Sequence, residues 1–168
     1  MEIRQLHKAD ADHYYVLRLE ALQESPQSFA ASYEEEKMQT VEKYQNRLAT
    51  TENAVSFGAF IDDHLVGMVT LIKEKPQNLR HRASLVAMYV KPEARRQGIA
   101  QALVTTVIEQ ARQMSEVEQL YLSVVTSNEP AKRLYQSLGF AVFGTEKRAL
   151  KIDNVYYDEE HMVLFLED

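Results

Sequence analysis

The stretch that most constrains the fold spans residues 83–111, where a strand pattern runs through a short loop into an amphipathic helix. Residues 83–90 are mostly apolar, which is typical of a buried strand. After the loop, apolar residues recur at helical spacing and fall on one face: Ile99, Leu103, Val104, Val107 and Ala111. This segment therefore predicts a strand–loop–helix unit.

The loop of this unit carries Arg95, Arg96 and Gly98. Unpaired backbone N–H groups at the start of a helix attract anions, and phosphate is a common ligand there. Gly98 permits a tight turn or a close backbone approach, Ala100 adds little bulk, and the arginines supply positive charge. The loop therefore predicts a pyrophosphate cradle. Taken alone, it fits equally well an ordinary strand-to-helix connection with solvated arginines.

The composition is that of a soluble globular protein, and we expect one domain spanning residues 1–168. A net charge of −6 argues against a nucleic-acid-binding protein, since such proteins usually carry a basic excess. No apolar run approaches the roughly 20 residues that cross a bilayer, and the N-terminus lacks a signal-peptide pattern. We therefore expect no membrane association and a cytoplasmic location. The absence of cysteine excludes disulfides, zinc–thiolate sites and a cysteine nucleophile.

The N-terminal half predicts a strand at 2–6, two helices and a hairpin. Asp10 is expected to cap a helix at 11–23, and Thr40 a helix that ends near residue 49. The first helix is expected to bury one stripe, formed by Tyr15, Leu19 and Leu22. Alternating runs at 55–61 and 65–71 flank an Asp-Asp-His turn and predict a β-hairpin.

The C-terminal half predicts a buried strand at 120–125, a helix that begins after Asn128, and two further strands at 140–145 and 161–166. Asn128 is suited to cap this helix, and Gly139 to end it. Because helices alternate with strands and one antiparallel hairpin is present, the chain predicts a mixed α/β sheet rather than a purely parallel one.

Two blocks in this half resemble the signatures of the GNAT superfamily of acyl-CoA-dependent N-acyltransferases. RRQGIA at residues 95–100 matches the superfamily pattern Gln/Arg-x-x-Gly-x-Gly/Ala. NEPAKRLYQSLGF at residues 128–140 is similar to Asn-x-x-Ala-x-x-Leu-Tyr-x-x-x-Gly-Phe. The blocks occur in the expected order with a buried strand between them. The resemblance implies an α/β fold of the α+β type, with a mixed, mostly antiparallel sheet flanked by helices.

The resemblance also implies a role for each matched position. Backbone N–H groups of residues 96–100 are expected to hold the pyrophosphate of coenzyme A. The strand edge at residues 88–90 is expected to pair with the pantetheine arm and to present the thioester. In the second block, Asn128 and Ala131 are expected to contact the cofactor arm, and Tyr135 to lie near the thioester sulfur. The implied cofactor-binding residues are Met88, Tyr89, Val90, Arg95, Arg96, Gln97, Gly98, Ile99, Ala100, Asn128, Ala131 and Tyr135.

Tyr135 is the residue that the resemblance places in catalysis, as a general acid. A phenol with a pKa of about 10 can protonate a departing thiolate with a pKa of about 8.5 while charge develops on the sulfur. The competing interpretation is core packing, because Tyr135 lies on the apolar stripe of its helix. Asn128 is likewise explained by helix capping, although one residue can perform both roles.

The sequence offers no unambiguous general base. Residues 84–90 contain no carboxylate, although some relatives carry one on the equivalent strand. Glu34, Glu35 and Glu36 predict a solvated helix face, and the Asp-Glu-Glu-His run at 158–161 predicts a turn into the last strand. The five histidines are scattered without ligand spacing, so we expect no metal site.

These features predict an N-acetyltransferase that moves an acetyl group from acetyl-CoA to a primary amine by direct attack in a ternary complex, since no cysteine can carry an acyl intermediate. The alternative is a non-catalytic acyl-CoA-binding regulatory or sensor module. A nucleotide-binding protein is disfavoured because the pattern Gly-x-x-x-x-Gly-Lys-Ser/Thr is absent. The acceptor stays open among small amines, polyamines, lysine side chains and peptide N-termini, and a homodimer also stays open.

Overall fold

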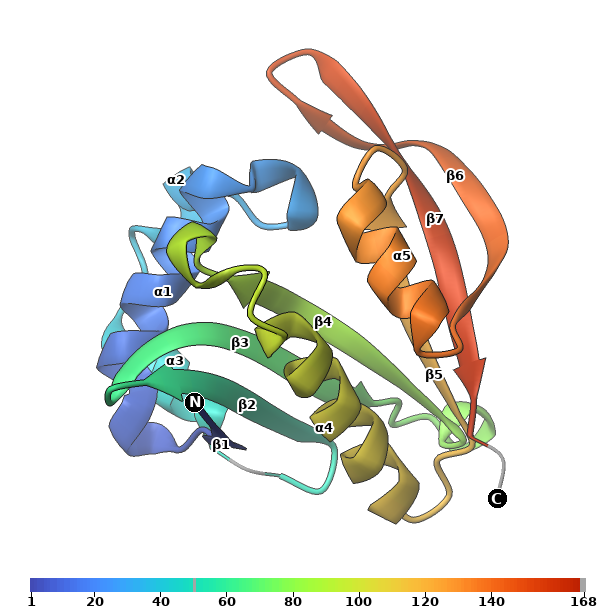
Figure 1. Cartoon of the computed structure of the whole chain (residues 1–168), viewed down its shortest axis with the longest axis horizontal. Helices are drawn as coiled ribbons and strands as arrows, with labels where there is room; N and C mark the ends of the chain where they lie inside the picture. Colours follow the sequence, from blue (N-terminus) through green and yellow to red (C-terminus); the bar gives the residue numbers. More distant parts are fainter. Residues whose placement is uncertain (50, 167–168) are drawn as a thin grey trace.

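The computed structural model describes residues 1–49 and 51–166 and contains one seven-stranded sheet with helices on both faces (Figure 1). The strands are β1 (Glu2–Gln5), β2 (Ala54–Ile61), β3 (His64–Lys73), β4 (Arg82–Val90), β5 (Gln119–Val125), β6 (Ala141–Ile152) and β7 (Val155–Phe165). They lie in the order β1-β2-β3-β4-β5-β7-β6. β4 and β5 are parallel, and the other neighbouring pairs of described strands are antiparallel. The predicted mixed, mostly antiparallel sheet is confirmed.

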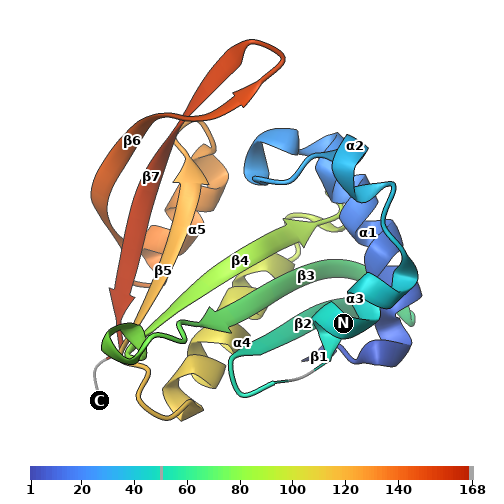
Figure 2. The same cartoon turned by 180° about the vertical axis from the view of Figure 1, so that it is seen from behind.

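Two groups of helices cover opposite faces of the sheet (Figures 1 and 2). The helices are α1 (Ala11–Glu24), α2 (Tyr33–Glu36), α3 (Val41–Leu48), α4 (Ile99–Gln113) and α5 (Glu129–Ser137). α1 and α3 pack on one face around Tyr14, Tyr44 and Met68. α4 and α5 pack on the other, over a larger cluster that includes Leu103 and Met162. Within the described residues, no helix has the length and hydropathy needed to cross a membrane.

The β2–β3 hairpin forms as its alternating pattern predicts. Its turn residues Asp62 and Asp63 have φ of 49° and 63°. Two consecutive residues with positive φ form the turn that matches the right-handed twist of hairpin strands. A short polar pair is therefore enough to reverse the chain between two buried strands.

The buried stripe of α1 differs from the predicted one. Leu22 is buried as expected, but Tyr15 and Leu19 are only half-buried. The buried residues are Ala11, Tyr14, Leu17, Arg18, Ala21 and Leu22. Apolar residues occur around the whole circumference of this helix, and the buried stripe includes an arginine. Apolar spacing alone therefore predicted the wrong buried face.

Asp10 precedes α1 as predicted, but its side chain makes no hydrogen bond to the N–H groups of that helix. Its carboxylate instead accepts hydrogen bonds from the Arg4 guanidinium at 2.8 and 3.0 Å and from the His7 N–H at 2.8 Å. These hydrogen bonds and the Arg4 charge hold the pKa of Asp10 below its usual value. Asp10 therefore fastens β1 to the start of α1.

The last two strands are longer than predicted, and residues 158–161 lie inside β7 rather than in a turn. The reversal occurs at Asp153 and Asn154, with φ of 49° and 66°. The distal part of this hairpin projects beyond α5 (Figure 1) and most of β6 is exposed. Because neither strand shows a clean apolar alternation there, the periodic signal for a strand is missing.

The acidic run at 34–36 also departs from expectation. Glu34 and Glu35 are exposed, but Glu36 is buried against α1 and α3. The Glu36 carboxylate accepts hydrogen bonds from Arg18 at 3.0 and 3.3 Å and from the Tyr44 hydroxyl. The interpretation of this run as a solvated helix face is therefore wrong for Glu36, because a buried arginine supplies the charge that compensates its carboxylate.

Candidate active site

β4 and β5 form a fork in the middle of the sheet. They pair only over residues 82–84 of β4 and 119–121 of β5. From there the two strands diverge, as both views of the chain show (Figures 1 and 2). An unpaired strand edge exposes a row of backbone N–H and C=O groups that an extended ligand can pair with. Met88, Tyr89 and Val90, the predicted pantetheine contacts, lie in this diverging part of β4.

A β-bulge bends β4 within the fork. The pairing of β4 with β3 passes from Val86 opposite Thr70 to Tyr89 opposite Met68, so β4 carries one extra residue. Ala87, inside the bulge, has a φ of 54°. Left-handed backbone at a residue other than glycine is uncommon and strained, and bulges re-aim backbone groups beside active sites. The bulge thus frees backbone groups of residues 87 and 88 from the ladder.

The loop after β4 leaves N–H groups unpaired where α4 begins. Gly98 precedes the helix with a φ of 78°, and Arg96 also has a positive φ of 63°. The first intrahelical hydrogen bond runs from the Ala102 N–H to the Gly98 carbonyl at 3.0 Å. The N–H groups of residues 99–101 therefore have no carbonyl partner within the helix.

A cavity of about 210 Å³ lies at this helix start. It is lined by Val90, Arg95, Arg96, Gly98, Ile99, Ala100, Gln101 and Leu134. Six of the predicted cofactor-binding residues therefore share one cavity with a residue of α5. Gln97 is exposed in the same loop but is not among the lining residues.

Arg95 is bound within the protein. Its guanidinium pairs with the Glu24 carboxylate at 2.8 and 3.3 Å, and its Nε donates to the Val90 carbonyl at 2.9 Å. Hydrogen bonds from Arg95 and Ser25 lower the pKa of Glu24. Arg95 thus fastens the loop to the end of α1, while the Arg96 side chain is exposed. Sequence reasoning missed Glu24, because nothing local links two residues 71 positions apart.

α5 brings the second sequence block to the fork. Asn128 caps this helix, with its Oδ1 accepting from the Ala131 N–H at 3.3 Å. The NH₂ group of Asn128 would be the donor in a hydrogen bond to a cofactor. Ala131 is half-buried beside it and packs against the same core cluster as Tyr135.

Tyr135 is almost fully buried, with 6% of its surface exposed. Its ring packs edge-on against Phe140 at a centroid distance of 5.9 Å. Within the described chain, its hydroxyl makes no hydrogen bond to another residue. Burial raises the pKa of Tyr135 to about 12, so the phenol stays protonated at neutral pH and can supply a proton.

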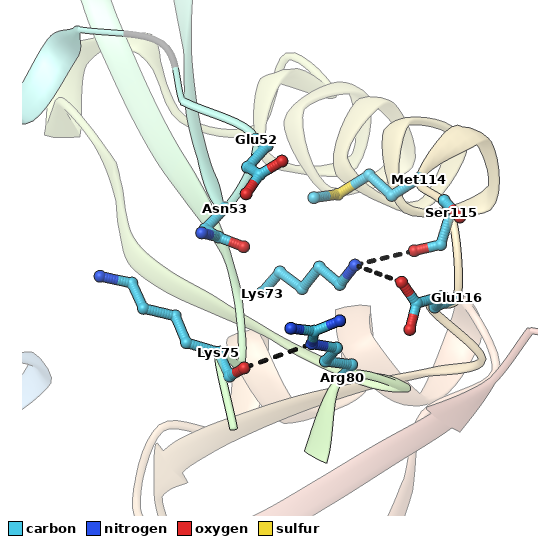
Figure 3. Close-up of a pocket in the computed structure, with 8 residues that line it drawn as sticks. All are labelled: Glu52, Asn53, Lys73, Lys75, Arg80, Met114, Ser115 and Glu116. Carbon is cyan, nitrogen blue, oxygen red and sulfur yellow. Dashed lines mark hydrogen bonds and ion pairs between the residues drawn. The ribbon is translucent and has the colours of Figure 1, made fainter. Parts of the chain in front are cut away.

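A larger cavity, of about 590 Å³, lies at the other end of α4 (Figure 3). Its walls carry Lys73, Lys75, Arg80, Glu52 and Glu116, among others. Lys73 donates to the Ser115 carbonyl at 3.0 Å and pairs with Glu116 at 3.8 Å. α4 alone separates this cavity from the loop at residues 95–98 by about 22 Å, given 1.5 Å of rise per residue. It contains none of the residues that the sequence blocks select.

The chain is similar to known proteins in sequence and in fold. Residues 13–140 match the Acetyltransferase (GNAT) family. The L-amino acid N-acetyltransferase AaaT of Escherichia coli is 28% identical over 120 residues, which cover 71% of this chain and 73% of that protein. A GNAT-family acetyltransferase from Streptococcus pneumoniae superposes with a TM-score of 0.90 at 23% identity, over 98% of both chains. The protein yncA of Salmonella typhimurium, solved with its cofactor acetyl-CoA, gives a TM-score of 0.82 at 18% identity over 100% of this chain and 95% of that one.

Proposed function

Because the chain belongs to the GNAT family of acetyltransferases, we propose that it transfers the acetyl group of acetyl-CoA to a primary amine by direct attack within a ternary complex. One observation carries the proposal: the start of α4 and the end of β4 at Val90 line a single cavity, which Leu134, the neighbour of Tyr135 on α5, also lines. A diphosphate, an extended amide-containing arm and a thioester each find a complementary surface there.

The cofactor would bind mainly through backbone groups. The N–H groups of residues 96–100 would donate to the diphosphate, and the positive end of α4 adds a favourable field. The amides of the pantetheine arm would pair with the free edge of β4 near Met88 and Val90, as an added strand does. Arg96 supplies the exposed positive charge, and Arg95 holds the loop in place.

At the thioester, the chain would contact two atoms, the carbonyl oxygen and the sulfur. A backbone N–H released by the bulge at Ala87 would donate to the carbonyl oxygen as negative charge develops on it. Tyr135 would donate its hydroxyl proton toward the sulfur as the C–S bond breaks. With the phenol pKa at about 12 and a thiol pKa near 8.5, full transfer in water would be uphill by about 5 kcal/mol. Burial also disfavours the thiolate and so raises the thiol pKa. The difference between the phenol pKa and the thiol pKa is therefore smaller inside the site than in water.

The acceptor that we propose is the α-amino group of an amino acid or peptide. The relative named L-amino acid N-acetyltransferase supports this class. An α-amino group has a pKa of about 7.7–8.0, so deprotonation at pH 7 costs about 1 kcal/mol, whereas a lysine amine with a pKa of about 10.4 costs about 5 kcal/mol. A site without a carboxylate on β4 is better suited to the acceptor that is easier to deprotonate.

Thiol release from acetyl-CoA across a panel of amines tests this proposal. The panel contains free amino acids, short peptides with free N-termini, N-terminally blocked lysine peptides and polyamines. We expect turnover with α-amino acceptors and much slower turnover with the other two classes. Turnover restricted to polyamines or lysine side chains would contradict the acceptor class, and no turnover with any amine would contradict the enzyme.

A further inference from the structure

Three polar side chains lie in a row on one face of the C-terminal half of the sheet. The Ser123 Oγ of β5 lies 2.7 Å from the His161 Nδ1 of β7, and the His161 Nε2 lies 3.0 Å from the Glu146 Oε1 of β6. The register explains the contact, because Ser123 is directly opposite His161 on the neighbouring strand. Residue 161 was predicted to end a turn, so the sequence gives no sign of this juxtaposition.

The hydrogen bonds of this row define a direction for a proton. A carboxylate only accepts, so the His161 Nε2 carries the hydrogen that points to Glu146. The Nδ1 atom then has a free lone pair and accepts the hydroxyl hydrogen of Ser123. The row is therefore arranged to receive a proton at its serine end and to hold it on the imidazole beside a carboxylate.

Ser123 lies where the fork opens. Tyr121 is the last residue of β5 that pairs with β4, and Ser123 follows it by two positions on the same face of the strand. The alternate residues Leu122 and Val124 point to the opposite face and share the core cluster with Tyr135. Ser123 and Tyr135 thus flank β5 from its two sides.

We propose that Ser123, His161 and Glu146 form a proton relay that deprotonates the acceptor amine during acetyl transfer, an inference that rests on the proposed function. The amine nitrogen bonds to the thioester carbonyl carbon, and the C–S bond breaks while the sulfur takes a proton from Tyr135. The nitrogen gives its surplus proton to the Ser123 oxygen as the Ser123 proton passes to the His161 Nδ1. The imidazolium then releases its proton to solvent, from which Tyr135 is reprotonated. Ser123 is the catalytic residue, and His161 and Glu146 act through it.

The surroundings of His161 add one more carboxylate. Glu159 lies two positions before His161 on the same face of β7, and its pKa is raised mainly by burial, with Glu146 raising and His161 lowering it. The Phe143 ring packs against the His161 imidazole at a centroid distance of 6.1 Å, and the Tyr121 ring packs against Phe143 at a centroid distance of 5.7 Å. Several titratable or polar groups around His161 can therefore contribute to the pH profile of the relay. They are Ser123 and Tyr121 on β5, Glu146 on β6 and Glu159 on β7.

Substitution along the row tests the relay with the full-length protein, acetyl-CoA and an α-amino acceptor. Ser123→Ala and His161→Ala are each expected to lower kcat by about 10²-fold, the lower end of what a general base contributes. Both should leave the calorimetric affinity for acetyl-CoA and the Tm unchanged, because these side chains are not in the core. Exogenous imidazole should restore part of the activity of His161→Ala, and the defect of both variants should shrink as rising pH supplies free amine. His64→Ala, at the exposed first residue of β3, is the matched control. Glu159→Gln tests whether the carboxylate of Glu159 contributes to the pH profile.

The outcomes distinguish the relay from the proposed function. Wild-type turnover together with unchanged kcat in Ser123→Ala or His161→Ala would overturn the relay alone. The relay is also overturned if imidazole restores nothing, or if mass spectrometry finds an acetyl group on Ser123 in the absence of amine, since the hydroxyl would then be a nucleophile. A wild-type protein that releases no thiol with any amine would overturn the proposed function and the relay with it.

Discussion

At the scale of single residues, the conformation of the backbone defines much of the proposed site, because its N–H groups would contact the cofactor. Gly98, Arg96 and Ala87 have positive φ at three positions around the fork. Glycine adopts this conformation without strain, whereas the other two residues are held there by their surroundings. The conformation of these residues determines which N–H groups face a ligand. We therefore expect substitutions here to change the affinity for the ligand more than the stability of the fold.

Gly98→Glu should reduce acetyl-CoA binding below detection. A Cβ atom at this position meets no atom within 4 Å, but the φ of 78° is strained for a side chain, and the carboxylate would repel a diphosphate. Gly98→Asn is the control, because asparagine tolerates this conformation and adds no charge. Titration calorimetry should rank the affinities as wild type, then Asn, then Glu. Equal affinity for wild type and the Glu variant would remove the loop from the site.

Tyr135→Phe should lower kcat by about 10²-fold while the affinity for acetyl-CoA changes little. The substitution removes one hydroxyl that has no hydrogen-bond partner in the described chain, and it keeps the ring packed on Phe140. Steady-state kinetics with thermal unfolding as a control would measure both effects. If kcat is retained, Tyr135 has only a packing role.

At the scale of elements, a buried ion pair joins α1, α2 and α3 on the face away from α4. Arg18 of α1 pairs with Glu36 of α2, and Tyr44 of α3 donates to the same carboxylate. Burial raises the pKa of Glu36, whereas the hydrogen bonds from Arg18 and Tyr44 lower it. The net result is a pKa below the usual value. A four-residue helix has little stability of its own, so this contact holds α2 against its neighbours.

Glu36→Ala should destabilise the protein by about 3–5 kcal/mol, since it leaves the Arg18 charge buried without a partner. Glu34→Ala, at the exposed start of the same helix, should change stability by about 0.5 kcal/mol or less. Urea unfolding at pH 7 would compare the two. Similar losses for both variants would contradict the assigned role of Glu36.

The same carboxylate should make stability sensitive to acid. Because its folded pKa lies below the usual value of 4.5, its contribution is present above that pH and is lost as pH falls through the folded pKa. The stability difference between wild type and Glu36→Gln should therefore shrink as pH falls below about 4.5. A difference that stays constant from pH 7 to pH 3 would show that the carboxylate is not ionised in the folded protein.

At the scale of the whole molecule, the sheet consists of two parts that separate at the fork. Strands β1–β4 carry α1, α3 and α4, and strands β5–β7 carry α5. The three ladder pairs between β4 and β5, together with the shared core under α4 and α5, hold the parts together. A ligand that pairs along β4 and contacts α5 would bridge them and stabilise the whole chain.

Acetyl-CoA should therefore raise Tm. At a ligand concentration of about 100 times Kd the folded state gains about 2.7 kcal/mol, which for a chain of this size corresponds to a shift of roughly 5–10 °C. Acetyl-pantetheine, which lacks the diphosphate, should give a much smaller shift at the same concentration. Hydrogen exchange should slow at residues 85–90 and 96–100. Equal shifts with both ligands would contradict a diphosphate site at the start of α4.

Much of this architecture could be predicted from local patterns. The β2–β3 hairpin, the strand leading into α4 and the Asn128 cap follow from spacing that acts over a few residues, and the two blocks at 95–100 and 128–140 identified the family. The outer part of the β6–β7 hairpin could not be predicted in the same way, because exposed strands have no apolar alternation to reveal them. The buried Glu36 was missed because its compensating charge comes from another helix.

The sequence by itself therefore determined the order of the strands and of the longer helices, the family and the loop that leads into α4, since each depends on neighbours in the chain. Only the tertiary structure decided that Arg95 binds Glu24, that β4 bulges at Ala87, and that Ser123, His161 and Glu146 line up across three strands. These contacts depend on strand register and on packing between distant segments. Hydrogen bonds and ion pairs act over a few ångströms in space, and distance along the chain does not specify which groups come that close.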